Sequence, residues 1–146
     1  MAILSRYMTD DHEACDRLFA EAENAAAAAD WATAAKQFDA FRAATLRHFL
    51  CEEDVLFPAF EERTGMTAGP TMVMRDEHTQ VRSVLDAMAN AVASHDMESY
   101  LGYSETLLML LRQHNLKEEQ MLYPMIDRAM PDAADALVAR MRELTA

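Results

Sequence analysis

Hydrophobic residues recur with the period of an α-helix in four long segments of the chain and one short one. The long segments run over about residues 9–29, 30–63, 71–93 and from 96 to beyond 123. The stretch 64–70, with two glycines and a proline, is the clearest loop. Pro131 and Asp132 introduce a short amphipathic segment that ends near residue 144. The pattern predicts an all-α protein, an up-down-up-down four-helix bundle with a short C-terminal fifth helix.

Capping residues indicate where these helices begin. Thr9, Asp10 and Asp11 provide good N-cap chemistry for the first helix, and Asp30 and Asp96 provide it for the second and fourth. The content of only three glycines and four prolines agrees with a helical protein. The length of 146 residues predicts a single domain over 1–146.

An internal repeat with an offset of 66 residues underlies the pattern. The sequence HFLCEEDVLFP at 48–58 returns as HNLKEEQMLYP at 114–124, and DDH at 10–12 returns as DEH at 76–78. The two repeats cover about 9–63 and 71–128. A duplication kept only for packing would preserve apolar positions and let polar ones drift, whereas here imidazoles and carboxylates recur in register. The repeat therefore predicts a metal site.

The positions of four histidines agree with this prediction. His12 and His48 are each 18 residues from Asp30, and His78 and His114 are each 18 residues from Asp96. In an antiparallel helix pair, residues equidistant from the turn lie at the same height. All four rings are therefore expected in one cross-section, roughly 27 Å from the hairpin tips at about 1.5 Å per residue.

Two glutamates complete the predicted set of metal ligands. In each repeat a His-x-x-x-Glu motif places a carboxylate one helical turn after a histidine, on the same face. The predicted ligands are His12, His48, Glu52, His78, His114 and Glu118. In the most economical arrangement each hairpin's histidine pair binds one ion and both glutamates bridge the two ions.

The chemistry of these donors favours two transition-metal ions. A single zinc ion would be satisfied by four ligands, and magnesium or calcium would prefer oxygen. Iron or manganese suits four nitrogen donors and two carboxylates. The ferritin-type di-iron bundle is a near alternative, but it uses Glu-x-x-His, and no glutamate lies three residues before any histidine here.

Charge and composition exclude several other classes of protein. The net charge is −12, with 13 basic residues scattered among 25 acidic ones, so a nucleic-acid-binding surface is not expected. No window approaches the ~20 apolar residues of a membrane span, and the first residues do not form a signal peptide. Two cysteines do not make a disulfide framework. We expect a soluble, cytoplasmic protein.

At the residues of the repeat, from about Thr9 to Asp127, the chain resembles the hemerythrin-like family, also called the HHE cation-binding domain. The motif here is His12, then His48-x-x-x-Glu52 followed by Leu-Phe-Pro, then His78, then His114-x-x-x-Glu118 followed by Leu-Tyr-Pro. The resemblance implies a four-helix bundle with two iron ions per chain, bridged by two carboxylates and an oxo or hydroxo group. Manganese is the alternative metal.

The resemblance also implies three possible functions. The first is binding, carrying or sensing dioxygen or nitric oxide. The second is oxidoreductase chemistry, such as reduction of nitric oxide or peroxide or repair of iron centres, which would require an electron donor protein. The third is a regulatory module that reports iron or oxygen, since metal binding and folding are linked when the ligands come from four helices.

Met74 marks a departure from the oxygen-carrying members of the family. Those carriers have His-x-x-x-His in the third helix, and Met74 stands at the earlier position here. The set of four histidines and two glutamates is instead similar to the di-iron domain of iron-centre repair proteins. A site without the fifth histidine is more open and suits redox chemistry or nitric oxide binding. Alternatively, Met74 is a core residue that fills a gap.

Several neighbours of the predicted ligands have weaker expectations. The acidic residues Asp11, Glu53, Glu77 and Glu119 adjoin ligands but lie about 100° round the helix from them, so we expect them to be mainly solvated rather than bonded to a histidine ring. Tyr123 is expected to pack near the site, with a hydrogen-bonding or radical role as the alternative. Cys15 and Cys51 are expected to be small buried residues, and His95 a surface residue.

Overall fold

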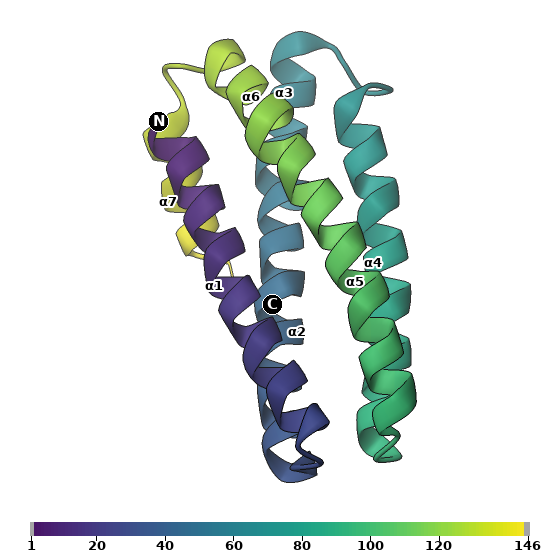
Figure 1. Ribbon diagram of the computed structural model, residues 1–146. Coiled ribbons are helices and arrows are strands. Elements are labelled where there is room, and N and C mark those ends of the chain that lie inside the picture. The colour runs from purple at the N-terminus through teal and green to yellow at the C-terminus, as the bar shows by residue number, and fades with distance from the viewer. Residues whose placement is uncertain (1, 145–146) are drawn as a thin grey trace.

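The protein is a bundle of helices, seen in a computed structural model that describes residues 2–144. Two antiparallel hairpins form the bundle, α1 (Ile3–Ala27) with α2 (Trp31–Cys51), and α4 (Pro70–Ala93) with α5 (Met97–Lys117). Both hairpin tips lie at the same end of the molecule (Figure 1). The described residues contain no strand. The predicted all-α bundle is thus confirmed.

The two hairpin tips repeat each other in detail. Asp30 accepts a hydrogen bond from the backbone N–H of Thr33 at 3.3 Å, and Asp96 accepts one from that of Ser99 at 3.1 Å. Each aspartate follows a residue in the left-handed conformation, Ala29 (φ 55°) or His95 (φ 54°), 66 positions apart. His95 is exposed, as expected, and its ring stacks on that of Trp31 across the two tips.

The first helix begins earlier than its capping residues indicated. It starts at Ile3, and Thr9, Asp10 and Asp11 lie inside it. The physical reason is burial, because Leu4 and Met8 are almost completely covered by the core at the end of the bundle opposite the hairpin tips. Packing of this first turn therefore outweighs the absence of a side-chain cap at Ala2. The predicted N-cap at Thr9–Asp11 is wrong.

A wide π-helical turn interrupts the second and fourth bundle helices at the same place. The turns are η1 (Glu52–Leu56) and η2 (Glu118–Leu122), and α3 (Phe57–Thr64) and α6 (Tyr123–Ala129) continue the two helices beyond them. In each turn the first carbonyl accepts from the N–H five residues later. A proline follows each turn by two positions, and proline cannot make the regular bond to residue i−4 in a helix interior. Both turns begin at a predicted glutamate ligand.

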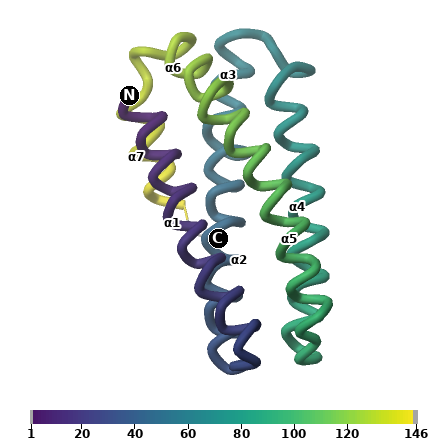
Figure 2. Tube along the Cα trace, in the orientation of Figure 1, coloured from purple at the N-terminus to yellow at the C-terminus, as the bar shows by residue number. Residues whose placement is uncertain are grey.

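Two apolar clusters lie on either side of the histidine level. The cluster toward the hairpin tips includes Phe38, Phe41 and Tyr100, and the cluster at the other end includes Phe57 and Phe60. The tube view follows the chain between these two ends (Figure 2). The polar ligands are therefore enclosed above and below by closely packed side chains, which exclude bulk water.

The predicted C-terminal helix is present as α7 (Ala134–Arg142), which packs on α1 beside the N-terminus (Figure 1). It begins after Pro131, Asp132 and Ala133, which form a turn. Arg47 of α2 donates to the carbonyl groups of Met141, at 2.9 Å, and Leu144, at 3.1 Å. These charge-assisted bonds satisfy carbonyl groups at the end of a helix, where they have no partner within it.

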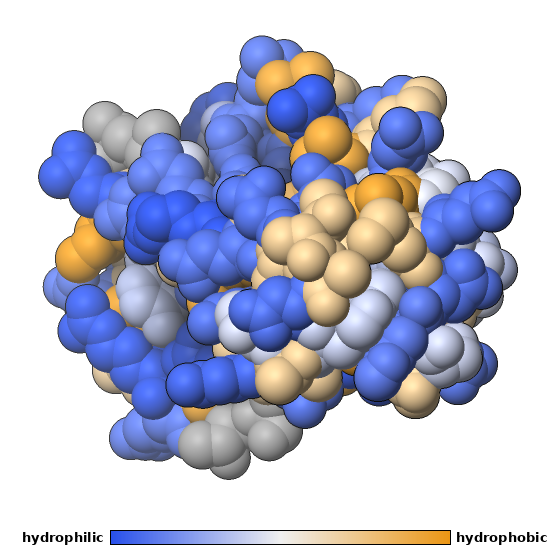
Figure 3. Space-filling view, turned by 60° about the horizontal axis from the view of Figure 1, so that its bottom comes forward, coloured by the Kyte–Doolittle hydropathy of each residue, from blue (hydrophilic) through white to orange (hydrophobic). Residues whose placement is uncertain are grey.

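The surface around the hairpin-tip end is largely hydrophilic, with a moderately hydrophobic patch in its middle (Figure 3). None of the helices within residues 2–144 combines the length and the apolar character that crossing a membrane requires.

Candidate metal centre

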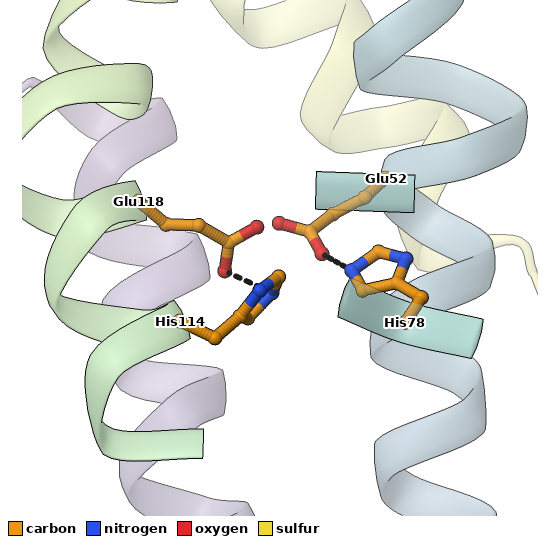
Figure 4. Close-up of side chains that lie close together, drawn as sticks. All are labelled: Glu52, His78, His114 and Glu118. Atoms are coloured by element: carbon orange, nitrogen blue, oxygen red, sulfur yellow. Dashed lines mark ion pairs between the residues drawn. The ribbon is translucent and has the colours of Figure 1, made fainter. Parts of the chain in front are cut away.

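The six predicted ligands come together in the middle of the bundle. Each of α1, α2, α4 and α5 contributes one histidine, and the two glutamates are the first residues of η1 and η2. All six are at most 4% exposed, and three of them, Glu52, His78 and Glu118, are completely buried. Figure 4 shows the carboxylates of Glu52 and Glu118 pointing toward each other above the rings of His78 and His114.

Their donor atoms form two overlapping groups. Glu52, His78, His114 and Glu118 each place one donor atom within 4.8 Å of the others, and so do His12, His48 and Glu118. Glu118 is common to both groups, and Oε1 of Glu52 lies 3.7 Å from Nε2 of His48. Both carboxylates therefore lie between the two histidine pairs, as an arrangement with two bridging glutamates requires.

Several of these buried atoms lack a hydrogen-bond partner within residues 2–144. Nε2 of His78 lies 3.0 Å from Oε1 of Glu52, and Nε2 of His114 lies 3.3 Å from Oε1 of Glu118. Among the described residues these two nitrogens and one oxygen of each glutamate have no partner in hydrogen-bond geometry. Unpaired buried polar atoms are costly, and four of them converging on one point fit a cation that would bind them.

The pKa shifts of the buried groups also indicate a site for a cation. Burial and the facing Glu118 raise the pKa of Glu52. Burial by itself would lower the pKa of His114, but the negative charges of Glu118 and Glu52 and the hydrogen bond to Glu77 outweigh that effect and raise the pKa to about 9. Both groups therefore hold a proton more readily than they would in water, and a bound cation would take the place of those protons.

A ring of four outer carboxylates orients the four histidines. The Nδ1 atom of each histidine lies at hydrogen-bond distance from a carboxylate, and the pairs are His12 with Glu119 (2.6 Å), His48 with Asp11 (2.7 Å), His78 with Glu53 (2.6 Å) and His114 with Glu77 (2.8 Å). Each Nδ1–H donated in this way leaves Nε2 directed to the centre, which is the tautomer that metal binding requires.

The expectation that these four carboxylates are mainly solvated is therefore wrong. They do lie off the ligand face of their own helix, but that position brings them to the boundary with a neighbouring helix. Asp11 of α1 accepts from the histidine of α2, and Glu77 of α4 accepts from that of α5. Sequence spacing within one helix could not show which histidine each carboxylate meets, since every pair joins two different helices.

Through Glu53, the stability that the four outer carboxylates contribute to the fold depends on pH. Burial by itself would raise its pKa, but hydrogen bonds from His78 and Arg82 lower it to about 2. A lowered carboxylate pKa contributes stability above the pKa of the unfolded chain, and this contribution is lost as the pH falls toward 2.

We expect Glu53→Gln to be less stable than wild type in urea unfolding at pH 6, with the difference shrinking between about pH 4.5 and 3. Arg82→Gln should weaken the same pH dependence, and a difference that stays constant to pH 3 would contradict the assignment.

Tyr123 lies at the centre of the site, where its hydroxyl makes the hydrogen bonds that the sequence analysis gave as the alternative to simple packing. Its buried hydroxyl can donate to Oε2 of Glu52 at 2.8 Å or to Oε1 of Glu118 at 2.9 Å, and it lies 3.3 Å from Nε2 of both His12 and His48. Burial and the two carboxylates raise its pKa, so the hydroxyl keeps its proton.

The π-turn explains why Tyr123 reaches this place. Residues five apart lie about 140° apart around a regular α-helix, so Tyr123 would point away from Glu118. The wide turn η2 brings both onto one face. The proline at position 124 was the sequence feature that could have indicated the turn. Phe57, the repeat counterpart of Tyr123, has no hydroxyl and instead stacks near His78, with ring centroids 5.9 Å apart.

The remaining residues considered in the sequence analysis, Met74, Cys15 and Cys51, are buried in the packed interior. Met74 is 3% exposed and belongs to the apolar cluster at the end opposite the hairpin tips. Cys15 and Cys51 are buried free thiols, as expected. Burial raises the pKa of Cys15 to about 11, so this thiol stays neutral.

Comparison with known proteins agrees with this geometry. The family model described as the Hemerythrin HHE cation binding domain matches residues 4–126, a stretch that contains all six converging side chains. Comparisons with curated proteins and with solved structures found no match. Because the match covers most of the chain, this protein belongs to the hemerythrin HHE cation-binding domain family.

Proposed function

We propose that the protein binds two iron ions at His12, His48, Glu52, His78, His114 and Glu118, and that it binds or senses dioxygen or nitric oxide there. The observation that carries the proposal is the convergence of four oriented imidazoles and two buried carboxylates, with unpartnered donor atoms, at one point. An iron pair held by these six residues would supply redox chemistry and the capacity to bind a small ligand.

Iron suits this set of donors better than the other common metals. A structural zinc site needs four ligands in a tetrahedron, and calcium and magnesium prefer oxygen alone. Six mixed donors in two overlapping groups provide nitrogen and carboxylate ligands for two ions. Manganese, with similar preferences, is the alternative metal.

The protein's own groups limit what can react at the site. The outer carboxylates hold the rings in position, and the apolar clusters exclude bulk water. Ligands that are at most 4% exposed leave room only for a small molecule. Tyr123 places a protonated hydroxyl beside both glutamates, where it can donate a hydrogen bond to them.

The alternative function is oxidoreductase chemistry on nitric oxide or peroxide, or repair of iron centres, with an electron donor protein as partner. Tyr123 favours this alternative, because its hydroxyl is a hydrogen-bond donor in contact with four of the proposed ligands. An iron-sensing or oxygen-sensing module is a further alternative. Turnover with an added reductant would distinguish the enzyme from the two binding functions.

Metal analysis of aerobically purified protein tests the proposal. We expect about two irons per chain and near-ultraviolet charge-transfer absorption, and we expect the reduced protein to bind nitric oxide with a change in its visible spectrum. A fully loaded preparation that contains one tetrahedral zinc ion per chain would contradict the di-iron assignment.

A further inference from the structure

The outer face of α5 carries a stripe of exposed residues without charge, here called the α5 stripe. Its residues follow one another in steps of four and three, which keep to one face of a helix, and in a last step of five across the wide turn η2. The members are Gly102, Thr106, Met109, Gln113, Leu116 and Met121. By contrast, every position is charged in the exposed row of α1 with the same spacing, namely Arg6, Asp10, Glu13 and Arg17. An uncharged stripe is therefore unusual on this protein, whose net charge is −12.

Three members of the stripe are the most exposed large apolar side chains of residues 2–144. Met109 is 64% exposed, Met121 is 63% exposed and Leu116 is 53% exposed. Apolar side chains that recur on one face of a helix normally pack against another element. A patch of this kind on the surface of a soluble protein marks a site of interaction.

The internal repeat shows what packs at the equivalent place on the other hairpin. Val55 stands 66 positions before Met121, but it is only 3% exposed. It belongs to an apolar cluster with Leu137 and Met141 of α7, and α7 contacts η1. Figure 1 shows α7 on the side of α1 and α2, away from α4 and α5. The second repeat thus offers a place for a helix that residues 2–144 do not fill.

The charges beside the stripe complement each other in a second copy of the chain. Glu105 and Arg112 are exposed and lie four residues before and three residues after Met109. When two α5 helices cross antiparallel at Met109, each Glu105 faces the partner's Arg112. Over most of the surface two copies with a net charge of −12 repel each other. The uncharged stripe is therefore the place where two copies can approach.

The sizes of the side chains favour the same register. Gly102 lies seven residues before Met109, and Leu116 lies seven residues after it. In a two-fold pair every contact occurs twice, so Leu116 of each copy packs over the partner's Gly102. Among residues 2–144, apart from the backbone of its own helix, nothing lies within 4 Å of the place where a Cβ of Gly102 would be. The glycine thus leaves room for the close approach of another helix.

We propose that the α5 stripe is the docking surface for a second copy of this chain, in an antiparallel two-fold arrangement centred on Met109. Met109 packs against the partner's Met109, Leu116 packs over the partner's Gly102, and Glu105 pairs with the partner's Arg112. This inference goes beyond the proposed function and does not depend on it, because none of the proposed metal ligands takes part.

Sedimentation velocity of the purified full chain over a series of concentrations tests the proposal. Wild type should show a reversible monomer–dimer equilibrium at micromolar concentrations. Met109→Glu sets two carboxylates against each other at the two-fold axis and should raise the Kd of the dimer at least tenfold. Ala43→Glu is the matched control, because Ala43 is the exposed repeat equivalent of Met109 on α2. Its Kd should stay within twofold of the wild-type value.

Two results of this experiment would overturn the proposal. One is a wild-type protein that stays monomeric up to about 1 mM. The other is an equal Kd for wild type and Met109→Glu, which would place any dimer interface elsewhere on the molecule.

Reversal of the bordering charges distinguishes a second copy from a different partner protein. Glu105→Arg brings two positive side chains together, and Arg112→Glu brings two negative ones together, so each variant should raise the Kd at least fivefold. The double variant exchanges the two charges and should return to within twofold of wild type, because both members of each ion pair come from the same sequence. A double variant as weak as the single ones would overturn the antiparallel pairing.

Cross-linking gives a readout that does not depend on the strength of association. Cys15 and Cys51 are buried, so Met109→Cys introduces an accessible thiol beside the two-fold axis. A short bismaleimide should link this variant into covalent dimers at least tenfold faster than it links the control Ala43→Cys. Circular dichroism verifies that both variants are folded. Equal rates of cross-linking in the two folded variants would overturn the proposal.

Discussion

Replacing Glu118 by glutamine is expected to remove both metal ions from the protein. The Oε1 atom of Glu118 lies 3.0 Å from Nε2 of His12 and 3.3 Å from Nε2 of His114, so this carboxylate faces both histidine pairs. The amide has the same shape but carries no negative charge, and it can place a donor where the ions need an acceptor. Metal analysis after loading should fall from about two ions per chain to well below one.

The exposed Glu105 of α5 provides the control for this substitution. Glu105→Gln changes the same chemical group on the same helix, away from the site, and should keep the full metal content. If Glu118→Gln retained one full equivalent of metal, Glu118 would serve a single ion, and the arrangement with two bridging carboxylates would be wrong.

Removing the metal with a chelator is expected to lower the melting temperature by roughly 10 °C or more for each ion. A ligand that binds only the folded state stabilises it by about 4 kcal/mol at a free concentration of about 1,000 times Kd. In a chain of 146 residues, 1 kcal/mol corresponds to a shift of roughly 2–4 °C. The buried carboxylates add to the effect, since they face each other at the centre of the bundle. Differential scanning calorimetry with and without chelator measures the shift.

The Glu118→Gln variant also serves as the control for this experiment. Because it should hold little metal, its melting temperature should respond weakly to the chelator. A wild-type melting temperature that chelation leaves unchanged, after complete loss of metal, would show that binding and folding are not coupled here. The proposal of an iron-sensing module would then lose its physical basis.

The ring of outer carboxylates shows how the fold prepares the centre before a metal arrives. Each of the four buried histidines is held by a carboxylate from a different helix, so the ring orientations depend on the four helices being assembled. Glu53 is held in turn by Arg82, and Glu77 is held by Lys117. Fixed orientation of this kind reduces the entropy that binding would otherwise cost.

Much of the candidate site could be predicted because a helix has a fixed rise and twist. Equal distances of His12 and His48 from Asp30 placed them at one height, and the i, i+4 spacing placed Glu52 one helical turn after His48 on the same face. Burial of all six side chains agrees with that arithmetic. Tyr123 could not be placed in the same way, since the wide turn before it breaks the regular period.

The sequence by itself determined the helical bundle, the two hairpins and the convergence of six donors, because these follow from periodicity and from a repeat with a constant offset. Only the tertiary structure decided the partners across helices, such as Asp11 with His48, and the position of the Tyr123 hydroxyl between the two glutamates. It also decided where the first helix begins, through burial of Leu4 and Met8. Contacts between helices depend on how far each helix is rotated about its axis and how closely it packs, and local sequence patterns do not record either quantity.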